Sequence, residues 1–499
     1  MLGARTHRII YVVLLTLLGG CIVTSTWASN LVWVLLSVNW LIEGRWREKW
    51  QMGRDSRLLH AFVALFLFLA VGLLWSSNLN AGLSVLQVKL PLLVVPLILL
   101  TTQPLDHRER IPVLFIYLTA VLVVSIMSTV RLFTIPNLPY RDAVPYISHI
   151  RFALFCCMAI FLCIGINAKH KSKKLLSVAV ILLALWLLLF LLIIRSYTGF
   201  AVLLVVSLVA MLAYWRRWPL IALWVLLVGG TAVLVGHEVR SYYRMVPMAT
   251  QPLRPLTAAY NPYEHAEDGI IENGNYVNNY LCQSELRKAW NNRSTIDYDG
   301  VTASGYSVES TLVRYLNAIG QTKDSVGMMA MTDDDIRAVE RGVANPVYES
   351  RNPLRKMVYV MLLEHEYYVH THAVAGFTML QRFELWKATW NVVSRHPALG
   401  VGTGDAVDAM HNELVKMDSE LVGTTKKTHN QYLSLAAMIG LIGLALTAFM
   451  FIRAWKRPSP LMLVWLVAIL VSCLTEDTLD TLAGILFCTW FLAMRNAKS

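Results

Sequence analysis

Two side chains that could take part in chemistry stand at the ends of long apolar segments. His429 follows a polar segment and precedes an apolar run that continues to about Trp455. A helix N-terminus disfavours the imidazolium form, so we expect a neutral ring that accepts a proton from a hydroxyl, as a general base does. The alternative is a helix cap or a surface residue. No His-x-x-x-His or acidic pattern accompanies His429, so we expect no metal site.

Arg195 is the second of these side chains. It lies between two apolar runs, just before Thr198 and Gly199, which open the second run. A charge at this position is costly unless it has water or a partner. The N-terminus of the following helix offers free N–H groups, and a guanidinium binds phosphate oxygens in a bidentate fork. These residues therefore predict a phosphate site; the alternative is an arginine that reaches the outer lipid headgroups.

Further cations fall at or near the same outer edge of the apolar segments, where positive charge is normally depleted. Singly, each could contact lipid headgroups. Together with Arg195 they predict an outward-facing cationic pocket for an anionic, lipid-linked ligand. They are Lys89, Arg131, Arg141, Arg151 and Arg382.

The elements that must position these residues are membrane spans. Of 499 residues, 56% are hydrophobic and only 15% are charged, which is typical of a polytopic membrane protein. A spanning helix needs about 20 apolar residues. The sequence predicts twelve spans, at about 9–25, 30–43, 59–76, 87–101, 111–131, 151–167, 175–195, 198–214, 218–236, 430–454, 459–475 and 480–495.

The basic residues fix the predicted orientation of these spans. Every predicted inside segment carries at least two Lys or Arg, whereas the short outside loops carry only Arg141. This asymmetry follows the positive-inside rule and predicts that both termini are cytoplasmic. The long segment 237–428 would then lie outside, in the periplasm of a Gram-negative organism. The net charge of +12 is thus explained by membrane topology, and no nucleic-acid partner is expected.

We divide the chain into residues 1–236 with nine spans, the outer segment 237–428, and residues 429–499 with three spans. Within the outer segment, 250–372 is polar and predicts a soluble insert. Residues 373–396 predict a helix that lies on the outer membrane face, with Trp386 among its apolar residues.

Local patterns give several smaller expectations. In the insert we expect a helix over Ser307–Ile319 that ends at Gly320, another helix that opens at Thr332, and irregular structure over 273–279. Cys282 is the one cysteine of the outer segment, so no internal disulfide is expected there.

Two loop segments near the predicted spans carry further expectations. The glycines of 400–404 indicate a tight turn, because no strand-turn-helix unit surrounds them. We expect Glu476, Asp477 and Asp480, between the last two spans, to form a solvated loop; the alternative is that they position cations.

Four motifs lie between about Ile194 and Leu444. The spacing from His429 to Gly440 fits a histidine-x10-glycine motif. With twelve spans and one large outer loop before the tenth, this pattern resembles the superfamily of O-antigen ligases and O-antigen polymerases, which are bacterial inner-membrane glycosyltransferases. The motifs are Arg195-Ser-Tyr-Thr-Gly, Arg382-x-x-x-Trp386, His396-Pro-Ala-Leu-Gly400-Val-Gly402-Thr-Gly404, and His429-Asn-Gln-Tyr-Leu.

The resemblance implies an all-α fold similar to the GT-C glycosyltransferases and a metal-independent, inverting transfer without a cofactor. The donor would be a glycan on undecaprenyl diphosphate. The acceptor would be a lipid A-core sugar in a ligase, or a second lipid-linked repeat unit in a polymerase. By position, Arg195 and Arg382 would bind the pyrophosphate and His429 would activate the acceptor hydroxyl. The remaining substrate-binding residues are expected to be Lys89, Arg131, Arg141, Arg151 and Trp386.

The sequence therefore predicts an O-antigen ligase of lipopolysaccharide biosynthesis in the bacterial inner membrane. An O-antigen polymerase and a protein O-oligosaccharyltransferase are the alternatives within this chemistry, and the insert at 250–372 leaves the acceptor open. A transporter of lipid-linked sugars ranks lower. Transporters often show two related halves and midplane charges, whereas here the charges cluster at one face.

Overall fold

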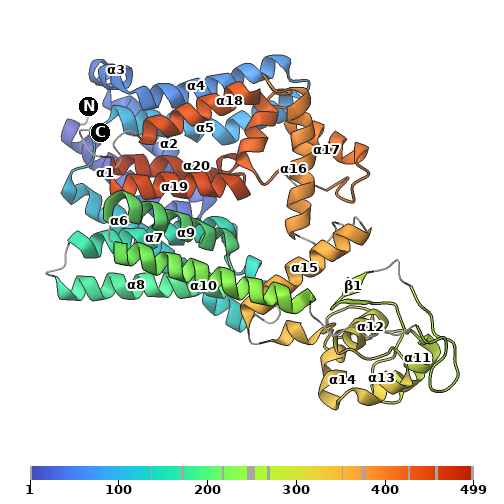
Figure 1. The fold of residues 1–499 in the computed structure, drawn as a ribbon. Helices are drawn as coiled ribbons and strands as arrows, with labels where there is room; N and C mark the ends of the chain where they lie inside the picture. Colours follow the sequence, from blue (N-terminus) through green and yellow to red (C-terminus); the bar gives the residue numbers. More distant parts are fainter. Residues whose placement is uncertain are drawn as a thin grey trace. The chain divides into compact units, whose positions relative to one another are not determined.

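The structure of the chain is a computed structural model. It describes residues 3–135, 138–169, 173–215, 218–243, 253–266, 270–350, 352–371, 374, 378–424, 427–455 and 459–495. The chain divides into two compact units, drawn in Figure 1 with colours that follow the sequence. Unit 1 comprises Met1–Ile221 and Leu385–Ser499, and unit 2 comprises Ala222–Glu384.

Unit 1 is a bundle of long apolar helices. Its N-terminal part supplies α1 (Ala4–Thr24), α2 (Thr26–Glu43), α3 (Trp46–Asp55), α4 (Arg57–Val71), α5 (Leu79–Thr101), α6 (His107–Thr134), α7 (His149–Lys169), α8 (Lys174–Ile193) and α9 (Tyr197–Ala210). Its C-terminal part supplies α17 (Ala406–Lys416), α18 (Gln431–Trp455), α19 (Pro460–Thr475) and α20 (Leu482–Trp490). Short helical turns lie at Gly72–Trp75, Tyr140–Asp142, Met211–Trp215, Thr478–Asp480 and Phe491–Met494.

The two parts of unit 1 are interleaved. Helix α18 packs against α4, α20 against α5, and α19 against α9 and α7. An aromatic cluster joins the two parts at the centre, where the Tyr117 and Trp490 rings lie 5.3 Å apart and the Phe155 and Phe487 rings 5.0 Å apart. Residues more than 300 positions apart in the sequence are thereby fixed beside one another.

Helix boundaries in unit 1 follow local capping chemistry. Asp106 and Glu109 form a capping box that starts α6, and Ser25 and Ser56 cap α2 and α4 through their hydroxyl groups. Each cap satisfies backbone N–H groups that the first helical turn leaves without a partner.

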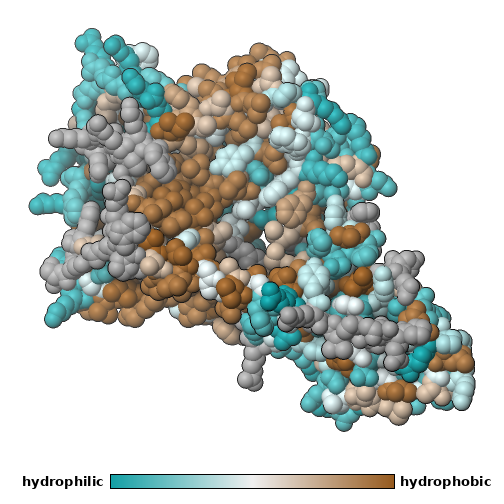
Figure 2. Space-filling view, in the orientation of Figure 1, coloured by the Kyte–Doolittle hydropathy of each residue, from teal (hydrophilic) through white to brown (hydrophobic). Residues whose placement is uncertain are grey.

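The membrane character predicted from the sequence is confirmed. Within the described residues, eight helices are long and apolar enough to cross a membrane, and three shorter apolar helices lie at Thr198–Ala213, Pro460–Thr475 and Leu482–Met494. Figure 2 shows hydrophobic side chains over the middle of the unit 1 helices and hydrophilic side chains at both of their ends. All twelve predicted spans fall on helices. Eleven of these are the eight long and three shorter apolar helices, and α2 is not among them. The total of twelve crossings stays a prediction.

Both ends of the described chain lie at one end of the unit 1 bundle (Figure 1). Arg8 in α1 donates to the Gln103 carbonyl oxygen at 2.7 Å, and Arg495 donates to the Thr102 carbonyl oxygen at 3.1 Å. The side of the membrane on which this end lies stays a prediction.

Unit 2 contains an insert with its own hydrophobic core. A two-stranded antiparallel hairpin pairs β1 (Ile271–Glu272) with β2 (Asn275–Tyr276). The core includes the fully buried side chains of Trp290, Leu312 and Val339. The helices of unit 2 are α10 (Trp218–Tyr243), α11 (Gln283–Asn291), α12 (Val308–Ala318), α13 (Ser325–Ala330), α14 (Asp333–Glu340), the turn Pro346–Glu349, α15 (Pro353–Thr371) and the first residues of α16 (Thr378–Arg395).

The insert matches the sequence expectations at its helices. Helix α12 has Ser307 as its N-cap and is followed by Gly320 at φ +72°, and Thr332 forms a capping box at α14. Cys282 is free, as expected. The irregular structure expected over 273–279 is partly wrong, because Asn275–Tyr276 is the second strand of the hairpin.

Candidate functional site

Helix α18 begins beside His429 and is broken at its middle. Asn430 is its N-cap: the side-chain oxygen accepts the backbone N–H groups of Tyr432 and Leu433 at 3.0 and 3.1 Å. At Ile439 and Gly440 the backbone leaves the helical conformation, and Gly440 has φ +65°. A kink of this kind leaves carbonyl groups in the preceding turn without their helical partners.

The segment 396–405, here called the glycine loop, supplies those missing partners. The N–H of Val401 donates to the Ala437 carbonyl at 2.8 Å, and the N–H of Gly402 donates to the Met438 carbonyl at 3.0 Å. The backbones are so close that a Cβ at Gly440 would clash with the main chain of the glycine loop. The predicted tight turn is present, and its glycines serve this close approach.

The far end of the glycine loop is fixed to α4 and α5. Thr403 donates its hydroxyl to the Leu69 carbonyl at 2.6 Å. The Asp405 carboxylate accepts the backbone N–H groups of Ser77 and Asn78, both at 2.7 Å. The part of α18 before the kink is therefore joined by hydrogen bonds, through the glycine loop, to the first half of the chain, and these contacts fix the position of His429.

Two carboxylates hold His429 itself. The backbone N–H of His429 donates to Asp477 Oδ2 at 2.8 Å, and the N–H of Asn430 donates to Asp477 Oδ1 at 3.1 Å. The ring Nδ1 lies 3.7 Å from Oε2 of Glu476. His429 has φ +52°, and its side chain is 37% exposed while that of Glu476 is 7% exposed. The ring thus has an acidic partner at one nitrogen and remains accessible.

A buried network lies beneath this arrangement. The Lys89 ammonium from α5 forms an ion pair with Asp480 and donates to the Leu479 carbonyl at 3.0 Å. Gln431 at the start of α18 donates to Asp480 at 3.0 Å and accepts the Leu479 N–H at 2.6 Å. Lys89 is 1% exposed, so its charge is directed at the carboxylate of Asp480.

The expectation that residues 476–480, here called the acidic loop, are solvated is wrong. Glu476 and Asp477 are each 5% exposed, and the loop binds the backbone of His429 and the Lys89 ammonium. Burial, and then the neighbouring Asp480 carboxylate, raise the pKa of Asp477 above its ordinary value. The alternative expectation was that these carboxylates position cations. The structure agrees with it, because Asp480 forms an ion pair with Lys89.

Arg151 and His149, at the start of α7, approach the same loop. Arg151 interacts electrostatically with all three acidic side chains of the loop. His149 interacts with Glu476 and also with Asp142, in the connection between α6 and α7. This connection therefore lies within electrostatic range of the acidic loop.

Three other predicted cations gather around that connection. Arg131, in the last turn of α6, donates to the Asp142 carbonyl at 3.5 Å. Arg141 lies in the helical turn Tyr140–Asp142. The Arg195 guanidinium lies 5.6 Å from the centroid of the Tyr140 ring, a cation–π distance. Arg195 is exposed and has φ +50°, and Ser196 caps α9 behind it.

Arg382 and Trp386 lie one turn apart on α16, which passes from unit 2 into unit 1. In unit 1, Thr389 of this helix and Thr428 have their hydroxyl oxygens 3.2 Å apart, next to His429 in the chain. The expected helix over 373–396 is present from Thr378; residues 373 and 375–377 lie outside the described part of the chain. Its placement on a membrane surface stays a prediction.

Unit 1 thus brings His429, Lys89 and Arg151 to the acidic loop. It brings Arg131, Arg141 and Arg195 to the connection between α6 and α7. The roles of these residues, and of Arg382, stay predictions. Sequence reasoning missed the function of the acidic loop. Charge complementarity in the sequence could have predicted it. Carboxylates between two apolar spans need cations, and the predicted cations lay on the same side of the predicted spans.

The chain was compared with known proteins. None of the curated proteins matches it. Residues 346–448 match a family model described as O-antigen ligase. The matched segment contains α16, the glycine loop, His429 and the kink at Gly440. Over residues 346–448, this match confirms the resemblance to the O-antigen ligase superfamily predicted from the motifs.

Proposed function

We propose that the protein is an O-antigen ligase that transfers a glycan from undecaprenyl diphosphate to a sugar hydroxyl of lipid A-core at the periplasmic face of the inner membrane. The family match supports a glycosyl transfer of the O-antigen ligase or polymerase type. The choice of ligase, of the lipid A-core acceptor and of the periplasmic face is our proposal, and it extends the prediction made from the sequence.

In the proposed reaction the acceptor oxygen attacks the anomeric carbon of the donor sugar. The bond from that carbon to the diphosphate oxygen breaks with inversion, and undecaprenyl diphosphate leaves with the bonding electrons. His429 takes the proton of the acceptor hydroxyl. Since Nδ1 faces Glu476, we assign this step to Nε2.

The observation that carries the proposal is the pair of carboxylates on His429. A general base works best when a third group orients it and stabilises the charge that it acquires. Glu476 lies beside Nδ1, and Asp477 fixes the backbone on which the ring stands. An exposed surface histidine would need neither contact.

The leaving diphosphate needs fixed positive partners, because it departs as an anion. We assign this role to Arg195 and Arg382, whose guanidinium groups remain charged. Arg131 and Arg141 add positive charge around Arg195. Lys89 has a different proposed role, because it neutralises Asp480 and so positions the acidic loop under His429.

The test is a reconstitution of the full chain in liposomes with undecaprenyl-diphosphate-linked glycan and lipid A-core. A ligated product and released undecaprenyl diphosphate are expected, and His429→Ala should abolish both. His60→Ala, an exposed histidine on α4, is the matched control and should behave as wild type. Product formed only with a second lipid-linked repeat unit would identify a polymerase instead. Undiminished turnover by His429→Ala would overturn the assignment of the base.

A further inference from the structure

Helix α3 forms a short amphipathic segment at the end of unit 1 that holds both chain termini (Figure 1). Trp46 and Trp50 are one helical turn apart, and they are 53% and 73% exposed. Lys49, between them in the sequence, is buried. Tryptophan side chains that project from the end of a membrane bundle are typical of the headgroup layer of a bilayer.

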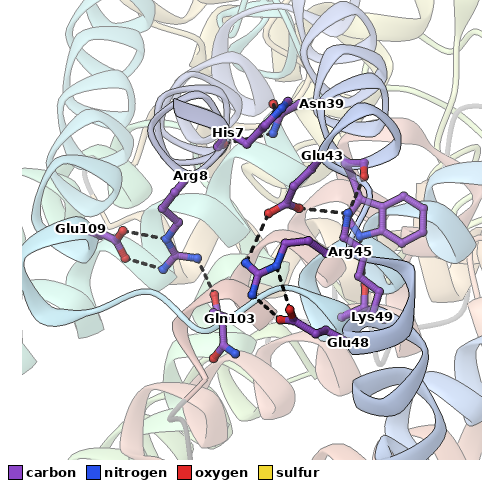
Figure 3. Close-up of polar contacts among 11 residues, drawn as sticks. His7, Arg8, Asn39, Glu43, Arg45, Glu48, Lys49, Gln103 and Glu109 are labelled. Atoms are coloured by element: carbon purple, nitrogen blue, oxygen red, sulfur yellow. Dashed lines mark hydrogen bonds and ion pairs between the residues drawn. The ribbon is translucent and has the colours of Figure 1, made fainter. Parts of the chain in front are cut away.

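A cavity of about 300 Å³ lies next to this helix. Its walls come from α3, from the start of α1 and α6, and from the ends of α2 and α5. Figure 3 shows the side chains of Arg8, Glu43 and Arg45 directed toward one space, with Gln103 beside Arg8. The cavity is separate from the acidic loop, which joins α19 to α20 and pairs with Lys89 in the middle of α5, whereas the cavity lies at the C-terminal end of α5.

Two of the cations in the wall are already bound within the protein. Arg8 donates to both carboxylate oxygens of Glu109, at 2.8 and 2.5 Å, and to the Gln103 carbonyl at 2.7 Å. Lys49 forms an ion pair with Glu43 at 2.9 Å and lies 4.7 Å from the Trp40 ring centroid.

Arg45 has an edge that is not hydrogen-bonded within the protein. It uses Nε and Nη2 to bind Glu48, whereas its Nη1 lies 3.9 Å from Glu43, beyond hydrogen-bond distance (Figure 3). The Nη1 edge of this guanidinium is a suitable donor to phosphate oxygens. Thr102 also lines the cavity, but its hydroxyl oxygen is fully buried and does not face the cavity.

The charges of the cavity wall exclude a simple anion as the best ligand. Three cations face four carboxylates, so an anion alone would enter a site with a net negative charge. A ligand with a phosphate and an ammonium matches both signs. An ammonium with N–H donors can also bind carboxylates, which a quaternary ammonium cannot do by hydrogen bonds. The cations are Arg8, Arg45 and Lys49, and the carboxylates are Glu43, Glu48, Asp106 and Glu109.

We propose that this cavity binds the phosphoethanolamine headgroup of a membrane phospholipid. The phosphate contacts Arg45, and the ammonium contacts the carboxylates of the wall, Glu48 and Asp106 among them. Trp46 and Trp50 anchor α3 in the headgroup layer beside the lipid. The site is separate from the proposed glycosyl transfer, and its occupancy does not depend on that function.

The test measures which lipid the full-length protein retains. Protein reconstituted with equal amounts of phosphatidylethanolamine, phosphatidylcholine and phosphatidylglycerol is transferred to detergent, and the bound lipids are counted by native mass spectrometry. Wild type is expected to retain one phosphatidylethanolamine. Arg45→Gln should lower its retention by about tenfold or more, since hydrogen bonds to charged groups are lost. Arg54→Gln, an exposed arginine on the same helix, should retain it.

Thr102→Val provides a second control in the wall of the cavity. It keeps the shape of the side chain and removes only a buried hydroxyl that does not face the cavity, so it should retain phosphatidylethanolamine as wild type does. Displacement of the lipid by soluble glycerophosphoethanolamine would support recognition of the headgroup itself. Equal retention of the three lipids, preference for phosphatidylglycerol, or full retention by Arg45→Gln would overturn the proposal.

Discussion

Asp477 accepts the backbone N–H of His429 at 2.8 Å, and the same carboxylate accepts the N–H of the next residue with its other oxygen. The loop between the last two helices thereby fixes the start of α18. Replacement by Asn leaves one accepting oxygen and places an NH2 group opposite an N–H group. We expect Asp477→Asn to lower kcat by about 10- to 100-fold, from the roughly 1.5–3 kcal/mol of a charge-assisted hydrogen bond. Steady-state transfer assays in liposomes measure this, and an unchanged kcat would contradict it.

Glu476 acts on the ring of His429 rather than on its backbone. Glu476→Gln removes the charge 3.7 Å from Nδ1 and keeps the shape of the side chain. A carboxylate beside Nδ1 stabilises the positive charge that the ring acquires when it takes the proton, so its loss should reduce kcat more than KM. A kcat equal to that of wild type would show that Glu476 does not assist the base. Glu420→Gln, an exposed glutamate elsewhere in unit 1, is a matched control.

Lys89 and Asp480 form a buried ion pair. We therefore expect the effects of substituting these two residues on the free energy of unfolding to be coupled. Lys89→Met leaves the Asp480 carboxylate buried without its cation, which typically destabilises a protein by about 3–5 kcal/mol. The double variant Lys89→Met/Asp480→Asn removes both charges and should regain part of that loss. Thermal unfolding in detergent tests this. Additive destabilisation by the two substitutions would mean that the ion pair does not exist in the membrane.

Gly440→Ala should disrupt the contact between α18 and the glycine loop. The position has φ +65°, and a Cβ there would clash with the Ala398 carbonyl. We expect a lower unfolding temperature and loss of transfer. Gly165→Ala in α7 is the control, because a Cβ at Gly165 meets no atom within 4 Å. Wild-type stability of Gly440→Ala would show that the kink is not required.

The insert should lose stability in acid through Glu285. Burial alone would raise the pKa of Glu285, but hydrogen bonds from Asn261, Ser325 and Thr257 outweigh it and hold the pKa at about 2. A lowered pKa means that the stabilisation is complete above the ordinary value of 4.5 and is lost as the pH falls toward 2. The protection factors for hydrogen exchange over 253–262 in the full chain, which compare the observed rate with the intrinsic rate at the same pH, should fall in this window. With Glu285→Gln, these protection factors should be lower already at about pH 6 and less dependent on pH.

Much of the helical framework was predictable from the sequence, because it depends on local patterns. Each predicted span falls on a helix, and the caps at Ser307 and Thr332 lie at the expected residues. Such features need only the apolar periodicity and the capping chemistry of a short segment. The hairpin at 271–276 was missed, since two-residue strands leave almost no periodic signal.

The interior of the candidate site was harder to predict, because it depends on pairs that are distant in the sequence. Lys89 and Asp480 are separated by 391 positions, and Asp405 and Asn78 by 327. The sequence around each residue does not indicate which distant residue it will contact. The same limit explains why Glu476 and Asp477 resembled a solvated loop: three carboxylates close together usually face water unless the fold supplies cations and N–H groups.

His429 and Arg195 share one feature of backbone geometry, with φ of +52° and +50° respectively. Residues other than glycine are uncommon in this region, although Asn, Asp and His occupy it more often than the others, and such positions store strain of about 1–3 kcal/mol each. The protein therefore carries its proposed base and one of its proposed phosphate ligands at a penalty in folding free energy. Glycine at either position would relax the backbone. We therefore expect such a variant to unfold at a higher temperature and, under the proposed function, to lose the transfer activity.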